Sequence, residues 1–203
     1  MLKSVSKEAD FFMLKEGYVT NKRFEALERD EFTFDAAEYD NCTFVKCDLA
    51  NSDMKNIRLT ECRFESCDLS NVMFASAELH DVSFVGCKLT GTDLSVVNPF
   101  MLAVDFSVCV LEYVSFARLP LKKTRFQECN MKHVFFDESD LSQAVLLRCD
   151  LENAAFINTN LEKADLSTSY NFMIDPTKNK IRKAKFSAEG AIGLLHSFDI
   201  VIV

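Results

Sequence analysis

The side chains able to do covalent or metal chemistry in this chain are eight cysteines and three histidines. Thiolates and imidazoles bind metal ions, and paired cysteines form disulfides. The cysteines, however, all occupy a sequence position that otherwise holds small or β-branched residues, where a free thiol acts as a small buried apolar group. We therefore interpret them as core-packing residues and expect neither disulfides nor a metal site: Cys42, Cys47, Cys62, Cys67, Cys87, Cys109, Cys129 and Cys149.

The histidines are scattered, and none shares the register of the cysteines. His80 and His133 fall on outward or turn positions, and His196 lies near the C-terminus. The sequence has no Gly-rich phosphate loop, no HExxH and no CxxC motif. We expect that the protein is not an enzyme, has no catalytic residues, and needs no cofactor.

The second feature of the chain that could serve binding is its charge. The sequence has 31 acidic and 23 basic residues, a net charge of −8 and a pI near 5.0. Residues 1–175 carry 29 acidic and 18 basic side chains, whereas residues 176–203 carry two acidic and five basic ones. This balance disfavours direct binding to a nucleic-acid backbone, which requires Lys and Arg to displace counterions. It favours attraction to basic surfaces of protein partners.

Aspartates recur at one position of a short sequence repeat, between a small residue and a large one. A row of acidic residues is usually only a solvated face, but a regular row could also contact a partner. We take four of them as candidate partner-binding residues: Asp48, Asp68, Asp140 and Asp150.

The element that positions these side chains is a five-residue ladder from residue 32 to residue 171. A large apolar residue recurs at every fifth position in two runs of 13, the first from Phe34 to Leu94 and the second from Phe106 to Leu166. A smaller residue precedes each large one by two positions. Internal repeats of this kind define the fold of the chain that contains them.

A period of five fits neither a straight helix nor a strand. The chain must turn once per repeat so that every fifth side chain points at one axis. A four-sided coil of about 20 residues does this, and each coil pairs with the next at the strand spacing of about 4.8 Å. Residues 20 apart should then stack, and Phe44, Phe64 and Phe84 form one such column. The stack buries a core that one coil cannot bury alone.

The ladder changes register between the two runs. Leu94 and Phe106 are separated by 12 residues where ten are expected, and Pro99 has no amide to donate to a central ladder. We predict a small loop near 98–102 within a break at 95–105. Its Phe100 and Met101 are candidates for a partner contact; the alternative is that Phe100 fills the coil.

The two ends differ from the repeat. Residues 1–31 are predicted to cap the first coil, with a partly frayed tail as the alternative. Residues 172–203 are predicted to hold the final repeats, a short helix after Ser187 and a terminal strand. An apolar helix and strand favour a dimerisation surface, with capping of a monomer as the alternative; its candidate residues are Ile192, Leu195, Phe198, Ile200 and Ile202.

Blocks such as Cys67-Asp68-Leu69-Ser70-Asn71 resemble the A(D/N)LXX unit of pentapeptide-repeat proteins, as does Ala164-Asp165-Leu166-Ser167-Thr168. The resemblance covers roughly residues 30–171. It implies an all-β fold, a right-handed quadrilateral parallel β-helix, here followed by a short C-terminal helix and strand.

The apolar tail makes the chain similar to the Qnr-type quinolone-resistance proteins. This resemblance implies a homodimer joined at the C-termini that imitates DNA and engages DNA gyrase or topoisomerase IV. One departure is that the chain lacks the two projecting loops of many Qnr proteins, since only the break at 95–105 adds residues. The alternative function is a non-catalytic scaffold for another protein. No signal peptide or membrane span is evident in the sequence, which favours a cytoplasmic protein.

Overall fold

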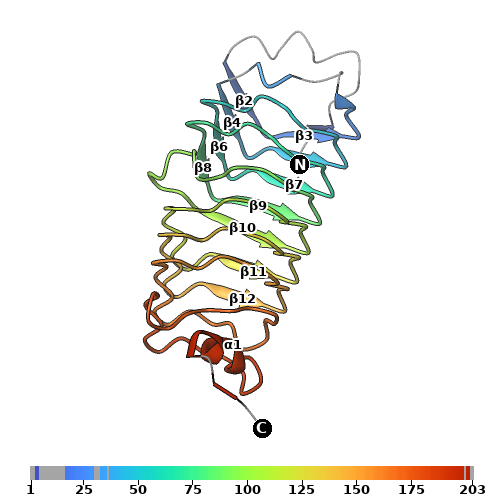
Figure 1. The fold of residues 1–203 in the computed structure, drawn as a ribbon. Coiled ribbons are helices and arrows are strands. Elements are labelled where there is room, and N and C mark those ends of the chain that lie inside the picture. The colour runs from blue at the N-terminus through green and yellow to red at the C-terminus, as the bar shows by residue number, and fades with distance from the viewer. Residues whose placement is uncertain (1–2, 5–16, 30–32, 36, 199, 202–203) are drawn as a thin grey trace.

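The computed structural model describes residues 3–4, 17–29, 33–35, 37–198 and 200–201. The chain winds as a parallel β-solenoid, seen as a stack of coils with the N-terminus at one end and the C-terminus at the other (Figure 1). The short strands are β1 (Lys3–Ser4), β2 (Tyr18–Thr20), β3 (Lys22–Glu25), β4 (Glu38–Asp40), β5 (Thr43–Val45), β6 (Arg58–Thr60), β7 (Arg63–Glu65), β8 (Glu78–His80), β9 (Val82–Val85), β10 (Val104–Ser107), β11 (Arg125–Gln127) and β12 (Val145–Leu147).

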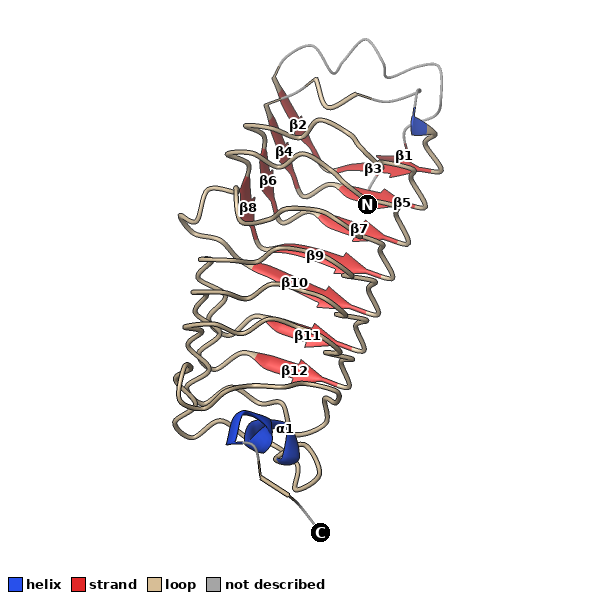
Figure 2. Ribbon diagram, viewed as in Figure 1, coloured by secondary structure: helices blue, strands red, loops and turns tan. Residues whose placement is uncertain are grey.

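The strands form two parallel sheets on different sides of the coil (Figure 2). One sheet has the order β1-β3-β5-β7-β9-β10-β11-β12, and the other has the order β2-β4-β6-β8. Pairing follows the predicted step of 20 residues, with Phe44 opposite Phe64 and Leu59 opposite Leu79. The remaining sides of the coils are held by single parallel bridges such as that between Asp48 and Asp68. The predicted solenoid is therefore confirmed.

The core consists of the two inward positions of each repeat. Phe64 and Cys62, for example, are 0% and 1% exposed. The Phe residues of one side stack with nearly parallel rings, at centroid distances of 4.7 Å for Phe44 and Phe64 and 5.1 Å for Phe84 and Phe106. Each such pair adds about 0.5–1.5 kcal/mol beyond its area burial. One ring size in one column explains why the sequence uses so many Phe residues.

All eight cysteines are buried and unbridged, which confirms the packing interpretation. Six of them lie in one column that continues through the register break: Cys47, Cys67, Cys87, Cys109, Cys129 and Cys149. Four of these thiols bond carbonyls of the coil before, as Cys109 Sγ does to the Phe84 oxygen at 3.3 Å. A bond to the neighbouring thiol of Cys67, together with burial, raises the pKa of Cys47. The column is thus a structural feature of the core.

Corners between the sides hold residues with left-handed backbone, such as Asn71 at φ 55° and Lys163 at φ 61°. This conformation is unfavourable for most L-residues and best tolerated by Gly and Asn. Ladder bonds hold it in place, since the Asn71 amide donates to the Thr90 carbonyl at 3.1 Å and the Lys163 amide to the Arg182 carbonyl at 3.0 Å.

The register break contains the predicted two extra residues, because Phe84 pairs with Phe106 at a step of 22 rather than 20. The sheet that contains β8 ends there, since the next coil forms a loop around Pro99 instead of a strand. Beyond the loop the regular step of 20 returns, with Phe106 opposite Phe126.

The structure corrects the extent of the repeat at its N-terminal end. The coils already include β2 and β3, upstream of residue 32, because Val19 pairs with Tyr39 and Phe24 with Phe44. Val19 and Phe24 continue the five-residue register backwards, and both are buried. Most of the predicted cap at 1–31, including Phe11 and Phe12, lies outside the described residues.

The C-terminal helix exists but is shorter than predicted, with α1 at Ile192–Leu195 followed by a 3-10 helix, η3, at His196–Phe198. Ser187 caps the turn that precedes it, since the Gly190 amide donates to Ser187 Oγ at 2.9 Å. The predicted terminal strand is wrong in the part described: Phe198 is helical, and Ile200 and Val201 do not belong to a strand. Ile202 lies outside the described residues. No helix in the described chain is long and apolar enough to cross a membrane.

Candidate protein-binding surfaces

The polar side chains of the described residues do not assemble a compact reactive centre. No group of three His, Cys, Asp or Glu side chains in those residues is placed to hold a metal ion. His133 instead stacks on Tyr113 with ring centroids 4.7 Å apart, and His80 Nε2 lies 4.0 Å from Glu78. The described surface carries rows of charged side chains and a few exposed apolar ones. Side chains of both kinds are suited to binding another macromolecule.

The four candidate aspartates do not all lie on one side of the coil. Asp48 bridges directly to Asp68, and the same column continues through Lys88, Val110 and Asn130 to Asp150. Asp140 belongs to another column, between Pro120 and Asn160. The structure therefore brings three of the four candidates onto one side, which we call the aspartate column (Asp48, Asp68 and Asp150), and separates Asp140 from them.

Each candidate aspartate also has a structural role that its spacing alone does not reveal. Its Oδ1 accepts the amide two residues ahead, from Ala50 to Asp48 at 3.1 Å and from Ser70 to Asp68 at 2.9 Å. Asp140 and Asp150 do the same with Ser142 at 2.9 Å and Glu152 at 3.3 Å. Such turns orient the carboxylate along the surface and explain why the repeat favours Asp or Asn at this position.

Cations of neighbouring coils balance part of this charge. Arg29 lies 3.4 Å from Asp48, Lys88 lies 3.6 Å from Asp68, and Lys132 lies 3.4 Å from Asp150. Burial acts to raise the pKa of Asp68, but the bonds from Ser70 and the charge of Lys88 outweigh it and lower the pKa. Exposed ion pairs of small individual strength therefore neutralise part of the charge of these carboxylates.

The loop at 98–102 presents two apolar side chains to solvent. Phe100 is 69% exposed and Met101 is 64% exposed, so Phe100 does not fill the coil. Asn98 Oδ1 accepts the Phe100 amide at 3.0 Å, which shapes the turn, and Met101 has a left-handed backbone with φ 56°. Leu102, which follows, is partly buried and packs against the core. Pro99 is exposed at the base of the turn, as expected of a residue without a donor.

The C-terminal end of the solenoid is apolar. Ile192, Leu195 and Phe198 are 52%, 39% and 49% exposed, and Ile200 continues the patch at 54%. The helix lies close against Phe172: an added Cβ at Gly193 would come within 2.2 Å of the Phe172 carbonyl oxygen. Figure 1 shows this element beyond the last coil, at the end that carries the C-terminus. The described dimerisation candidates are therefore all exposed at this end of the solenoid.

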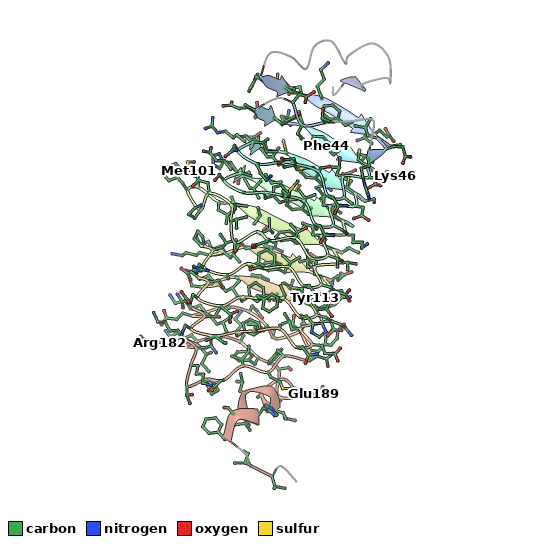
Figure 3. All side chains as sticks on the ribbon, turned by 45° about the horizontal axis from the view of Figure 1, so that its top comes forward. Phe44, Lys46, Met101, Tyr113, Arg182 and Glu189 are labelled. Atoms are coloured by element: carbon green, nitrogen blue, oxygen red, sulfur yellow. The ribbon has the colours of Figure 1, made fainter. Side chains whose placement is uncertain are left out.

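One row of charges was missed in the sequence. A corner beside the β2-β4-β6-β8 side carries Glu61 and Asp81 before the loop, and Lys123, Lys163 and Lys183 after it. All five have left-handed backbone and are exposed. The 20-residue step could have revealed the row, because its members occupy equivalent positions of successive coils. We call it the charged corner; Figure 3 shows Met101 and Arg182 on this edge of the rod.

Comparison with protein families gives matches to two descriptions of the same repeat. Residues 57–98 match a pentapeptide repeat region, and residues 120–154 and 136–169 match pentapeptide repeats of eight copies. These matches fall on both sides of the loop. A sequence comparison with curated proteins found no match.

Solved structures give the same fold. A trypsin-treated form of QnrB1, a plasmid-mediated fluoroquinolone resistance protein, is similar with a TM-score of 0.53 and 20% identity, over 89% of this chain and 99% of that one. HetL, a pentapeptide repeat protein involved in heterocyst differentiation regulation from the cyanobacterium Nostoc sp. strain PCC 7120, has a TM-score of 0.49 and 13% identity, over 84% and 85% of the two chains.

Proposed function

We propose that this chain, a pentapeptide-repeat protein, binds a type II topoisomerase, DNA gyrase or topoisomerase IV, by imitating duplex DNA. The repeat specifies the core and leaves the outward side chains to carry function. In this proposal the protein occupies the basic surface that otherwise holds DNA. It acts by binding alone, without catalysis or a cofactor.

The observation that carries the proposal is the aspartate column on a rigid rod. Asp48 and Asp68 are one coil apart, at about 4.8 Å along the rod axis. Their turn bonds fix them before a partner arrives, so little side-chain entropy is lost on binding. Fixed negative charges on neighbouring coils, as at Asp48 and Asp68, resemble the charged phosphates that a DNA-binding protein contacts. The net charge of −8 steers the rod towards a basic surface.

A second support is the resemblance to QnrB1, whose name describes fluoroquinolone resistance. We extend the proposal to protection: a rod bound to the topoisomerase shields it from quinolones. The protein then works in the cytoplasm, where these enzymes act on DNA. The likeness to QnrB1 concerns the fold, and the charge of this chain's own surface makes the functional argument.

We also propose that two copies join end to end through the C-terminal apolar surface. Ile192, Leu195, Phe198 and Ile200 present it in a single patch next to the last coil. Exposed apolar patches of this kind mark interfaces. Joining the two ends about a two-fold axis doubles the length of the acidic rod.

Neutralising the aspartate column is expected to weaken binding to gyrase by about tenfold or more, since each lost contact with a basic surface removes part of the attraction. The variant is Asp48→Asn, Asp68→Asn, Asp150→Asn, which keeps an oxygen for each turn bond and removes only the charge. Binding is measured by fluorescence anisotropy at several salt concentrations, and the variant should also show a shallower salt dependence.

The matched control is Asp165→Asn. Asp165 accepts the Ser167 amide at 3.1 Å and pairs with Lys185 at 2.9 Å, but it lies on the β12 side of the coil. It should bind gyrase as the parent protein does. Undetectable binding by the parent at low salt, or unchanged binding by the triple variant, would rule out the proposal.

A scaffold for another partner is the second candidate function, favoured by the exposure of Phe100 at the tip of the loop. Under this alternative the acidic residues only keep the protein soluble. Phe100→Ala would then abolish partner binding while the triple Asp→Asn variant retains it.

A further inference from the structure

The charged corner is acidic on one side of the loop and basic on the other. Its acidic members Glu61 and Asp81 and its basic members Lys123, Lys163 and Lys183 have no ion pair among the described residues. Elsewhere on the rod, opposite charges of adjacent coils do pair, as Arg58 does with Glu38 and Glu78 at 2.6 Å. Along this corner, charges of opposite sign are instead separated by the loop.

The neighbouring outward positions follow the same division. Before the loop this side carries Glu38, Asp40 and Glu78 with one cation, Arg58. After the loop it carries Lys122, Lys180 and Arg182, with Asp140 and Glu162 as the anions. The side therefore has an acidic half and a basic half.

Within the part of the chain that the structure describes, the loop lies midway along this side. Four described inward residues precede it (Val19, Tyr39, Leu59 and Leu79), and four follow it (Leu121, Leu141, Leu161 and Ile181). A two-fold axis at the loop, perpendicular to the rod, would therefore bring the acidic half of one copy opposite the basic half of another. A surface that matches itself under a two-fold rotation is the requirement for an isologous dimer.

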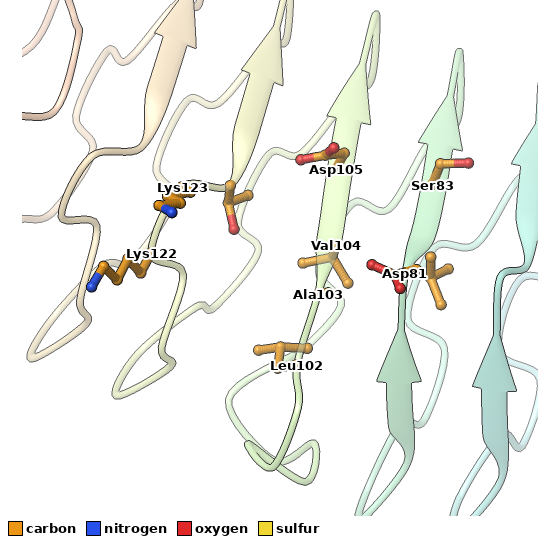
Figure 4. Close-up of a pocket in the computed structure, with 10 residues that line it drawn as sticks. Asp81, Ser83, Leu102, Ala103, Val104, Asp105, Lys122 and Lys123 are labelled. Atoms are coloured by element: carbon orange, nitrogen blue, oxygen red, sulfur yellow. The ribbon is translucent and has the colours of Figure 1, made fainter.

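A groove at the base of the loop is lined by both charged and apolar side chains, among them Asp81 and Val104. It has a volume of about 310 Å³, and its walls include Leu102, Asp105, Lys122 and Lys123. Figure 4 shows the two lysines on one side of it, across from the strand that carries Asp105. The groove forms where the ladder is interrupted: the Arg125 amide donates to Asp105 Oδ1 at 2.8 Å.

In other coils the equivalent amide bonds a backbone carbonyl of the coil before. Arg63 donates to Cys42 at 2.9 Å, and Ser83 donates to Cys62 at 3.0 Å. At Arg125 a bond to a side chain takes the place of this carbonyl bond, and the exposed Phe100 and Met101 directly precede Leu102, which lines the groove.

We propose that two copies of this chain pair side by side and antiparallel along this face. The acidic half of each copy contacts the basic half of the other, and Phe100 and Met101 of each loop enter the groove of the partner copy. The inference rests on the charge pattern, the loop and the groove, and it does not depend on the proposed topoisomerase binding.

The interface is narrow. Nine coils at about 4.8 Å give a length of roughly 40 Å, and a side of about three extended residues gives a width near 10 Å, so each copy buries on the order of 500 Å². This area lies below the usual size of a stable dimer interface. Charge therefore contributes much of the specificity, and association should fall steeply with salt.

The test exchanges charges within the corner of the full-length chain. An all-acidic variant carries Lys123→Glu, Lys163→Glu and Lys183→Glu, and an all-basic variant carries Glu61→Lys and Asp81→Lys. Glu, Asp and Lys already occupy this left-handed corner position in different coils, so the fold accepts each exchange. All proteins also carry Leu195→Asp, which removes association through the C-terminal end from the readout.

Sedimentation velocity is measured at roughly 0.05 M and 1 M salt, where charges are weakly and strongly screened. At low salt, the Leu195→Asp parent should form dimers, each charge variant alone should be monomeric, and an equimolar mixture of the two variants should form dimers again. At high salt all should be monomers. Phe100→Ser in the same parent should weaken the low-salt dimer by about tenfold.

Restoration in the mixture is the decisive outcome, because it requires the charged corners of two copies to contact each other. A parent that remains monomeric at low salt, or variants that dimerise as well alone as when mixed, would overturn the proposal. So would a parent that dimerises only when a polyanion such as heparin is added, since the basic half would then be a site for that ligand.

Discussion

Phe106→Ala is expected to lower the free energy of unfolding by roughly 3–5 kcal/mol, the range for removing a buried aromatic side chain. Phe106 is 1% exposed and lies between the rings of Phe84 and Phe126, at centroid distances of 5.1 and 5.3 Å. Phe116 meets it edge-on at 5.6 Å. The substitution therefore removes two stacked contacts and one edge contact and leaves a cavity in the axis of the rod.

The measurement is equilibrium unfolding in urea. Phe135→Ala is the matched control, because Phe135 follows the same repeat but points outward and is 42% exposed; its effect should stay within about 0.5 kcal/mol. A loss below about 1 kcal/mol for Phe106→Ala would show that the coils close around the gap, and it would contradict the account of a rigidly stacked core.

Leu195→Asp is expected to convert an end-to-end dimer into monomers. Leu195 lies in α1 within the apolar patch formed with Ile192 and Phe198. Near a two-fold axis the substitution sets two carboxylates against each other and against apolar side chains, and burying such charges costs several kcal/mol. Sedimentation equilibrium at high salt measures this association, because a predominantly apolar contact persists when charges are screened.

Removing residues 198–203 should have the same effect, since it deletes Phe198 and Ile200 from the patch. Val108→Asp is the control: Val108 is 54% exposed but lies on a corner of the central coils. It should leave the dimer intact. A parent protein that already sediments as a monomer would show that the patch only covers the end of the solenoid.

The five-residue ladder made the fold predictable because each repeat carries its own large apolar residue for the core. Every large residue from Tyr39 to Leu94 and from Phe106 to Leu166 is buried in the same way, so a spacing read from the sequence translates directly into stacking. The two extra residues at the break were predictable for the same reason, since only a 22-residue step restores Phe106 to the column of Phe84.

The ends were less predictable because their partners are not repeats. Val19 and Phe24 follow the register, but the residues around them do not, and their place in the coil became evident only from their pairing with Tyr39 and Phe44. The apolar composition of the tail indicated a strand, yet Phe198 is helical and the described residues Ile200 and Val201 do not belong to a strand.

The surface was the hardest part to predict. The core constrains each outward residue only through its turn, so the sequence did not distinguish a functional aspartate from one that holds a turn, and Asp68 does hold one. The sequence also did not separate Asp140 from the aspartate column. The charged corner becomes visible when the side chains are read down the coils, because its members are 20 or more residues apart.

The most direct test of the proposed function is a DNA gyrase supercoiling assay with purified protein, in the presence and absence of ciprofloxacin. If the rod occupies the DNA-binding surface, micromolar protein should inhibit supercoiling on its own or restore it when the drug is present, and added salt should weaken either effect. Supercoiling that is unchanged under both conditions at low salt would contradict topoisomerase binding as the function of this protein.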